Sequence, residues 1–298
     1  MPPRLTVLLV LLVLCALLAA TAHADPARID AVVAQSSCAS HKWPGRGIAP
    51  RGYVRGMGRA YAKAWCDLRR PTSVASRLAG TDFDAATDAL AHYGRAGGSP
   101  QDRLRALYAL ALGEGMREST GNASTGFNRG VRHASSQDAE AGLFQVMPNS
   151  LDDSPWLGEL YDQYRSQPSW CLREVFMAGA KDRRQPVIGK GPDAEFQRFT
   201  KACPAFAVDY ATIVLRTDMR KFPPVRHRKA QLTQACVAMF EQVERVAADD
   251  CGDPVAPGSR MPAALSESRS AATGTPPASR SPSARPPAPS SRPSSPSR

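Results

Sequence analysis

The sequence predicts a mostly α-helical domain followed by a disordered C-terminal tail. Apolar residues recur at spacings of three and four over long stretches, which is typical of helices with one buried face. No stretch shows the convincing alternation of apolar and polar residues that a strand requires. From Gly252 onward the composition changes to Pro, Ser, Ala and Arg without aromatic residues, and such a segment cannot form a core. The remaining chain, within 298 residues that are 43% hydrophobic, is long enough for one substantial domain.

The chain is expected to have three parts. Residues 1–24 are typical of a signal peptide, with Arg4 as the positive start, residues 5–20 as the apolar core and Ala22-His23-Ala24 as the cleavage site. The helical domain then spans residues 25–251, and the disordered tail spans residues 252–298. Cleavage near Ala24 would place the protein in the periplasm or outside the cell, without stable membrane insertion.

The cysteines indicate disulfide bonds. Six remain after removal of the signal peptide, an even number that is expected to pair in an oxidising compartment. They are Cys38, Cys66, Cys171, Cys203, Cys236 and Cys251. Fifteen pairings are possible, and the sequence does not choose among them. Because no CxxC motif or closely spaced Cys/His pair exists, we expect no zinc site, and we expect no organic cofactor.

The N-terminal part of the domain, residues 25–98, is expected to be helical support for a core at residues 99–251. Helices are predicted at residues 53–70 and 82–93, the second capped by Thr81 or Asp82 and ended by Gly94. Further helical segments are predicted at residues 151–180, 194–217 and 226–248, with a loop at 186–192 and a break at Pro223-Pro224.

A long helix is predicted to begin after Ser99. Ser99 is a good N-cap, Pro100 suits the first helical position because its missing N–H has no partner there, and Asp102 adds a favourable charge to the first turn. The segment Ser119-Thr120-Gly121-Asn122 forms turns readily and should end the helix.

Glu118 falls on the apolar stripe of this helix, whereas Glu114 lies toward the edge, so Glu118 is predicted to be the more deeply placed carboxylate. The stripe comprises Leu104, Leu107, Tyr108, Ala111, Leu112 and Gly115. Burial and the negative end of the helix dipole both favour the protonated form of such a carboxyl. A group that keeps its proton near neutral pH is what general acid catalysis needs, and the polar loop that follows would let Glu118 line a cleft.

Two short motifs carry a family resemblance. Glu118-Ser119, followed by the run from Gly142 to Pro148, resembles the catalytic Glu-Ser and Gly-Leu-Met-Gln motifs of soluble lytic transglycosylases and goose-type lysozymes, in the lysozyme-like superfamily. Residues 115–119 and 140–145 also resemble uncharacterised secreted bacterial proteins of this fold. The third transglycosylase motif, Ala-Tyr-Asn, is not evident, and Tyr210 is its nearest approach.

The resemblance implies a lysozyme-like helical domain that cleaves the β-1,4 bond between muramic acid and glucosamine in peptidoglycan, with Glu118 as general acid. Ser119 and Gln145 would position the acid or the sugar, and Gly142 would allow a close backbone approach. We also allow for a small β-hairpin near the cleft, in the loop after Glu118.

Asp138 and Glu140 are the candidates for a second carboxylate, which in glycoside hydrolysis activates water or stabilises the developing cation. The alternative is that both are ordinary solvated loop charges. The family resemblance implies that transglycosylases dispense with this group, because the acetamido arm of the muramic sugar stabilises the cation and the sugar's own hydroxyl closes an anhydro ring.

The formal net charge of +11 at pH 7 suits a protein that works near anionic envelope polymers, but charge alone does not separate these polymers from nucleic acid. Export and the lack of a nucleic-acid-binding motif argue against DNA or RNA as a partner. Two alternatives to an enzyme stay open. One is a non-catalytic peptidoglycan-binding protein that kept the fold, and the other is a structural envelope protein that adheres through its basic tail.

Overall fold

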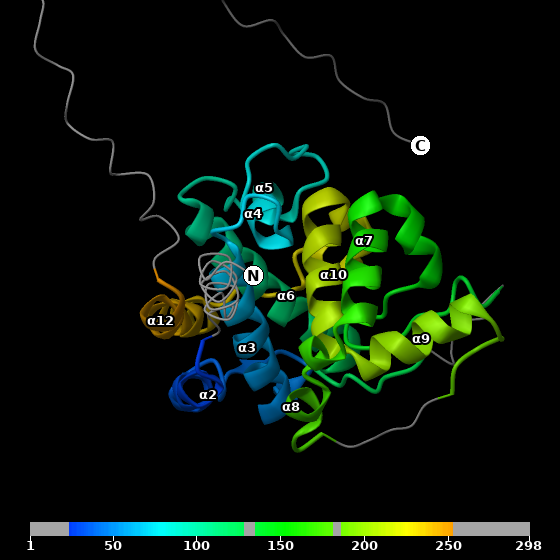
Figure 1. Cartoon of the computed structure of the whole chain (residues 1–298), viewed down its shortest axis with the longest axis horizontal. Helices are drawn as coiled ribbons and strands as arrows, with labels where there is room; N and C mark the ends of the chain where they lie inside the picture. Colours follow the sequence, from blue (N-terminus) through cyan, green and yellow to red (C-terminus); the bar gives the residue numbers. More distant parts are fainter. Residues whose placement is uncertain (1–23, 128–134, 181–185, 253–298) are drawn as a thin grey trace, which may run out of the picture. The chain divides into compact units, whose positions relative to one another are not determined.

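The computed structural model of the protein describes residues 24–127, 135–180 and 186–252, and most of these residues are helical (Figure 1). The mostly α-helical fold class is therefore confirmed. In the described ranges, no helix combines the length and the apolar character needed to cross a bilayer. The predicted signal peptide and C-terminal tail lie outside these ranges, apart from Ala24 and Gly252.

The central element is α6 (Pro100–Ser119), and α3 (Arg51–Asp67), α10 (Pro204–Thr217) and α12 (Gln234–Cys251) pack around it (Figure 1). Its start is the predicted one. Ser99 Oγ accepts a hydrogen bond from the N–H of Asp102 at 3.1 Å, and the Asp102 carboxylate accepts one from the N–H of Ser99 at 2.9 Å. This reciprocal capping box satisfies two backbone donors and fixes the first residue of the helix.

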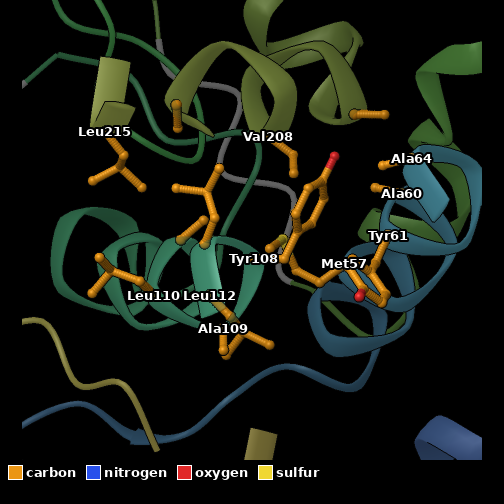
Figure 2. Close-up of a cluster of buried hydrophobic side chains, with 14 of the residues drawn as sticks. Met57, Ala60, Tyr61, Ala64, Tyr108, Ala109, Leu110, Leu112, Val208 and Leu215 are labelled. Carbon is orange, nitrogen blue, oxygen red and sulfur yellow. The ribbon is translucent and has the colours of Figure 1, made fainter. Parts of the chain in front are cut away.

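The core surrounds α6 instead of lying along one stripe, so the predicted apolar stripe was too narrow. Figure 2 shows Met57 and Tyr61 of α3 and Val208 of α10 on different sides of Tyr108. Gly113 lets another segment approach closely, since a Cβ there would lie 2.3 Å from the backbone oxygen of Gln231. Neighbours on several sides account for a helix that is buried almost throughout its length.

In the N-terminal part, the helix predicted at 53–70 is confirmed as α3, and α2 (Pro26–Gln35) packs against it. The prediction of a helix over 82–93 was wrong. Only α5 (Ala89–His92) forms there, with Asp88 as its N-cap, and a short α4 (Val74–Leu78) precedes it. Aspartate side chains accept hydrogen bonds from backbone N–H groups two residues ahead, as Asp84 does from Ala86, and this favours turns over a longer helix.

The long helices predicted downstream are broken into shorter ones. Residues 151–180 contain the second half of η1 (Pro148–Asp153), then α7 (Pro155–Ser166), η2 (Pro168–Cys171) and α8 (Arg173–Met177). Residues 194–217 divide into α9 (Pro192–Ala202) and α10, followed by η3 (Met219–Lys221), and α11 (Pro223–Arg226) precedes α12. Most of these elements begin with a proline, which starts a helix well but cannot continue one from the preceding residues.

The described residues form one two-stranded sheet, in which β1 (Lys42–Trp43) pairs antiparallel with β2 (Gly47–Ile48). Gly45 adopts a φ of +69° in the connecting turn. A hairpin was allowed for in the loop after Glu118, of which residues 128–134 lie outside the described residues. In the described part of that loop, the only strand-like pairing is the isolated bridge between Ala141 and Val146.

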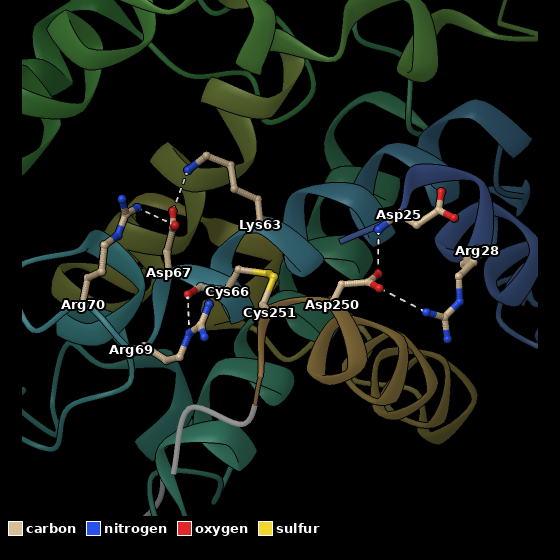
Figure 3. Close-up of a disulfide and its surroundings, with 9 residues drawn as sticks. All are labelled: Asp25, Arg28, Lys63, Cys66, Asp67, Arg69, Arg70, Asp250 and Cys251. Carbon is tan, nitrogen blue, oxygen red and sulfur yellow. Dashed lines mark hydrogen bonds and ion pairs between the residues drawn. A yellow bond between two sulfur atoms is a disulfide. The ribbon is translucent and has the colours of Figure 1, made fainter. Parts of the chain in front are cut away.

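Three disulfides use all six of the predicted cysteines, so the disulfide prediction is confirmed. The pairs are Cys38–Cys236, Cys66–Cys251 and Cys171–Cys203. The first two join the N-terminal part to α12 across sequence separations of 198 and 185 residues. Beside Cys66–Cys251, Asp250 accepts hydrogen bonds from the backbone N–H of Asp25 and from Arg28 (Figure 3). These links hold both ends of the described chain together.

A buried ion pair joins α10 to the segment before α5. Arg216 Nη1 donates to both carboxylate oxygens of Asp88, at 2.9 and 2.7 Å, and Arg216 Nη2 donates to the backbone oxygen of Gly80 at 2.7 Å. The guanidinium also lies 3.9 Å from the ring centre of Phe83. Because both charged side chains are almost wholly buried, each depends on the other for compensation.

We predict that Asp88→Asn destabilises the fold by about 3 kcal/mol or more, because it leaves the guanidinium of Arg216 buried without its counter-charge. Asparagine retains the oxygen that accepts from the N–H of Leu90, so the cap of α5 is kept. Urea unfolding measures the change. Glu174→Gln, in the exposed pair Arg173–Glu174, is the control and should cost less than about 1 kcal/mol. Equal losses for the two variants would contradict the prediction.

Candidate active site

Glu118 lies in the last turn of α6 and is partly exposed. The helix ends at Ser119, as predicted, because Thr120 and Gly121 adopt left-handed conformations with φ of 57° and 72°. The backbone N–H groups of these two residues donate to the carbonyl oxygen of Gly115. The chain therefore turns away directly after Glu118, which leaves its side chain at the edge of the core.

Ser119 holds this turn. Its hydroxyl donates to the carbonyl oxygen of Gly115 at 3.1 Å and accepts from the N–H of Asn122 at 3.1 Å. The side chain is buried. Ser119 was predicted to position the acid or the sugar. In the structure, the Ser119 hydroxyl forms its hydrogen bonds with backbone groups on either side of Glu118.

Gly142 and Gln145 form a tight turn closed by the bridge between Ala141 and Val146. Gly142 has a φ of +76°, and a Cβ there would lie 2.7 Å from Thr200 Cγ2, so α9 packs closely against this glycine. Gln145 also has a positive φ, of 50°, and its Nε2 donates to the carbonyl oxygen of Gly142 at 2.9 Å. The amide of Gln145 thus helps to close the turn from which it projects.

The segment that carries the second motif, Gly142 to Pro148, packs against α6 at Gly115, just before the first motif, Glu118-Ser119. A Cβ on Gly115 would lie 3.3 Å from Phe144 Cε1 and 2.2 Å from the hydroxyl oxygen of Tyr53. Phe144 is fully buried. The absence of a side chain at Gly115 therefore lets α3 and the 142–145 turn pack against α6 just before Glu118.

The two candidates for a second carboxylate differ in their surroundings. The negative charge of Glu140 is one of the influences that raise the pKa of Glu118, so Glu140 contributes to its electrostatic environment. Asp138 accepts hydrogen bonds from Ser135 Oγ at 2.9 Å and Asn149 Nδ2 at 3.1 Å. These bonds tie Asp138 to Ser135 of its own loop and to η1. Glu140 is therefore the better placed of the two for a role beside Glu118.

Two arginines beside Glu118 were missed in the sequence. The positive charges of Arg46 and Arg117 both act to lower the pKa of Glu118. Arg46 lies in the β1–β2 turn, and Arg117 Nη1 donates to the backbone oxygen of Pro44 in the same turn at 3.2 Å. The Pro44-Gly45 dipeptide between Trp43 and Ile48 is a turn signal that could have revealed the hairpin, but not its place beside α6.

The prediction that Glu118 lies deeper in the core than Glu114 was wrong. Glu114 is 0% exposed, whereas Glu118 is only partly buried. Burial and the nearby charge of Glu118 raise the pKa of Glu114 to about 9. In this conformation neither carboxyl oxygen of Glu114 reaches a partner with good hydrogen-bond geometry, although Glu118 is close enough to influence it. Glu114 is therefore protonated at neutral pH.

The pKa of Glu118 is also raised, principally by burial, and the charge of Glu140 adds to the effect. Interaction with Glu114 and the two arginines opposes the increase. The direction agrees with the prediction from its position at the end of a buried helix. A carboxyl with a raised pKa at the edge of the core can deliver a proton to a bound molecule and take one back.

Tyr210 belongs to a different environment. It is buried in α10, and its ring centre lies 5.6 Å from that of Phe206 and 6.1 Å from that of Phe196. These contacts place the tyrosine in an aromatic cluster. They give it a packing role and do not relate it to Glu118.

Within the described ranges, no group of three or more His, Cys, Asp or Glu side chains is arranged to hold a metal ion. No protein-family model matches the chain, and neither the curated proteins nor the solved structures include a significant match to it. The functional conclusion therefore rests on the residues around Glu118.

We predict that Gly142→Ala destabilises the fold more than Gly45→Ala does. Both glycines have positive φ, but nothing lies within 4 Å of a Cβ at Gly45, whereas one at Gly142 meets Thr200. Crowding should add about 1–3 kcal/mol to the cost of backbone strain, measured by urea unfolding. Thr200→Ser removes the crowding methyl and should recover part of this difference in the double variant. Equal costs for the two glycine variants would refute the close packing.

We also predict that Glu114 makes the fold less stable as pH rises. Its folded-state pKa of about 9 exceeds the ordinary 4.5, so unfolding releases its proton between these values. The stabilisation is complete below pH 4.5 and is lost as pH rises toward 9, by about 1.4 kcal/mol per pH unit. Unfolding between pH 5 and 8 should show this slope relative to Glu114→Gln. If the free energy of unfolding changed with pH in parallel for the native protein and Glu114→Gln, a protonated Glu114 would be excluded.

Proposed function

We propose that the protein is an exported glycosidase with a lysozyme-like fold that cleaves the β-1,4 bond between N-acetylmuramic acid and N-acetylglucosamine in peptidoglycan. The observation that carries the proposal is the position of Glu118 at the end of a buried helix, where burial raises its pKa. The convergence of the Glu118-Ser119 and Gly142–Gln145 segments at Gly115 supports the same conclusion.

Glu118 acts as the general acid in this mechanism. Its proton passes to the glycosidic oxygen as the bond to the sugar breaks, so that the leaving group departs as a neutral alcohol. The resulting Glu118 carboxylate then accepts a proton from the group that attacks the sugar cation. In a transglycosylase this group is the 6-hydroxyl of the same muramic sugar, and in a lysozyme it is water.

Glu140 would serve the hydrolytic version as the second carboxylate, because its charge already acts on Glu118. Arg46 and Arg117 supply positive charge beside the acid. Guanidinium groups pair well with carboxylates, such as those of the peptides attached to the glycan. The net charge of +11 favours the approach of the protein to an anionic wall polymer.

Three disulfides suit an oxidising compartment outside the cytoplasm, as the predicted signal peptide requires. The first two close very long loops between the N-terminal part and α12. The oxidised protein is therefore the form in which activity is to be measured.

We predict that the oxidised protein releases soluble muropeptides from purified peptidoglycan and that Glu118→Gln lowers the rate by about 100-fold or more, because glutamine has no proton to donate. Mass spectrometry of the released material measures both the rate and the product. Glu174→Gln, at a side chain that is 90% exposed, is the matched control and should keep full activity.

Products lighter than the hydrolytic product by one water identify a transglycosylase, and products with a reducing end identify a lysozyme. No product from the native protein, or equal product from Glu118→Gln, contradicts the catalytic proposal. In that case, saccharide binding that survives Glu118→Gln would establish the alternative of a non-catalytic peptidoglycan-binding protein.

A further inference from the structure

Glu114 is a buried carboxyl whose surroundings leave its oxygens without hydrogen-bond partners. Its side chain is 0% exposed, and neither oxygen has a partner with good hydrogen-bond geometry in this conformation. A buried polar group left in this state costs free energy, and such groups are uncommon in native proteins. The position therefore calls for a reason beyond packing.

The two tyrosines that interact electrostatically with Glu114 do not donate a hydrogen bond to it. Tyr53 of α3 and Tyr93 after α5 both interact with the charge of Glu114, which adds to the effect of burial in raising their pKa values. Tyr53 donates its hydroxyl proton to the carbonyl oxygen of Leu112 at 2.8 Å, and Tyr93 donates its own to that of Ala230 at 2.8 Å. Each hydroxyl proton is thus committed to a backbone acceptor.

Glu118 is the acceptor within reach on the same helix. It follows Glu114 by four residues, so the two side chains lie on one face of α6, one turn apart. The other charged groups that act on the pair are Arg117 of α6, Arg46 in the β1–β2 turn and Glu140 before the 142–145 turn. Two adjacent carboxyls in a buried site do not both ionise readily, and the fully buried one keeps its proton.

We propose that Glu114 is a positioning residue for Glu118, which keeps its own proton and offers it as a hydrogen bond to the carboxylate that forms when Glu118 gives up a proton. This inference rests on the proposed role of Glu118 as the general acid. The Glu118 proton goes to the leaving oxygen, the Glu114 proton stays on Glu114, and the attacking hydroxyl or water later restores the proton of Glu118. The bond strengthens in the ionised state because a carboxylate is a stronger acceptor than a neutral carboxyl.

The test is a carbon-13 NMR titration of the glutamate carboxyls in the oxidised full chain, for the native protein, Glu114→Gln and Glu114→Leu. Glutamine keeps a neutral donor, so the pKa of Glu118 should stay within about half a unit of the native value. Leucine removes the donor, so the pKa of Glu118 should rise by about one unit or more. The alkaline limb of the activity profile should move to higher pH by the same amount in Glu114→Leu.

An unchanged Glu118 pKa in Glu114→Leu, or a Glu114 carboxyl that is ionised at pH 7 in the native protein, would overturn the inference. The second measurement uses the unaltered chain, so it decides the question even where Glu114→Leu fails to fold. The titration requires no substrate. A protein that shows the expected shifts but releases no muropeptides would refute the proposed function and leave the coupling between Glu114 and Glu118 established.

Discussion

The burial of α6 on almost every side is the constraint on which the rest of the structure depends. A helix surrounded by α3, α10 and α12 must either pair or neutralise its polar side chains, because little water reaches them. The capping box at Ser99 satisfies its first turn. At the other end, the same constraint raises the proton affinity of Glu114 and Glu118. One packing arrangement thus stabilises the fold and sets the chemistry of the site.

Gly115 links packing to chemistry. Its missing side chain admits Tyr53 and Phe144, and its carbonyl oxygen accepts from the Ser119 hydroxyl and from the backbone beyond the helix. The residue that admits α3 and the 142–145 turn against α6 is therefore also the residue whose carbonyl oxygen accepts the hydrogen bonds that close the end of the helix. Because both effects act within one turn of Glu118, they fix the end of the helix that carries this side chain.

The features that the sequence predicted well are those with local causes. Ser99, Pro100 and Asp102 start α6 through contacts within one turn, and Ser119-Thr120-Gly121 ends it in the same way. The features that it predicted poorly have distant causes. Glu114 is buried although it lies at the edge of the local apolar stripe, and Arg46 acts on Glu118 by charge from a hairpin far away in the sequence. The disulfide partner of each cysteine is fixed only by the assembled helices. Proline breaks within the later helices carried a local signal that the apolar periodicity obscured.

The proton affinity of Glu118 results from a balance of opposing effects. Burial and the charge of Glu140 favour its protonated form, whereas Arg46, Arg117 and the interaction with Glu114 favour the carboxylate. In the proposed role of general acid, Glu118 must also release its proton during the reaction, which burial alone would oppose. Groups that stabilise the carboxylate are as necessary as the burial that retains the proton. The positive charges of Arg46 and Arg117 supply that stabilisation, and the buried Glu114 supplies it through its interaction with Glu118.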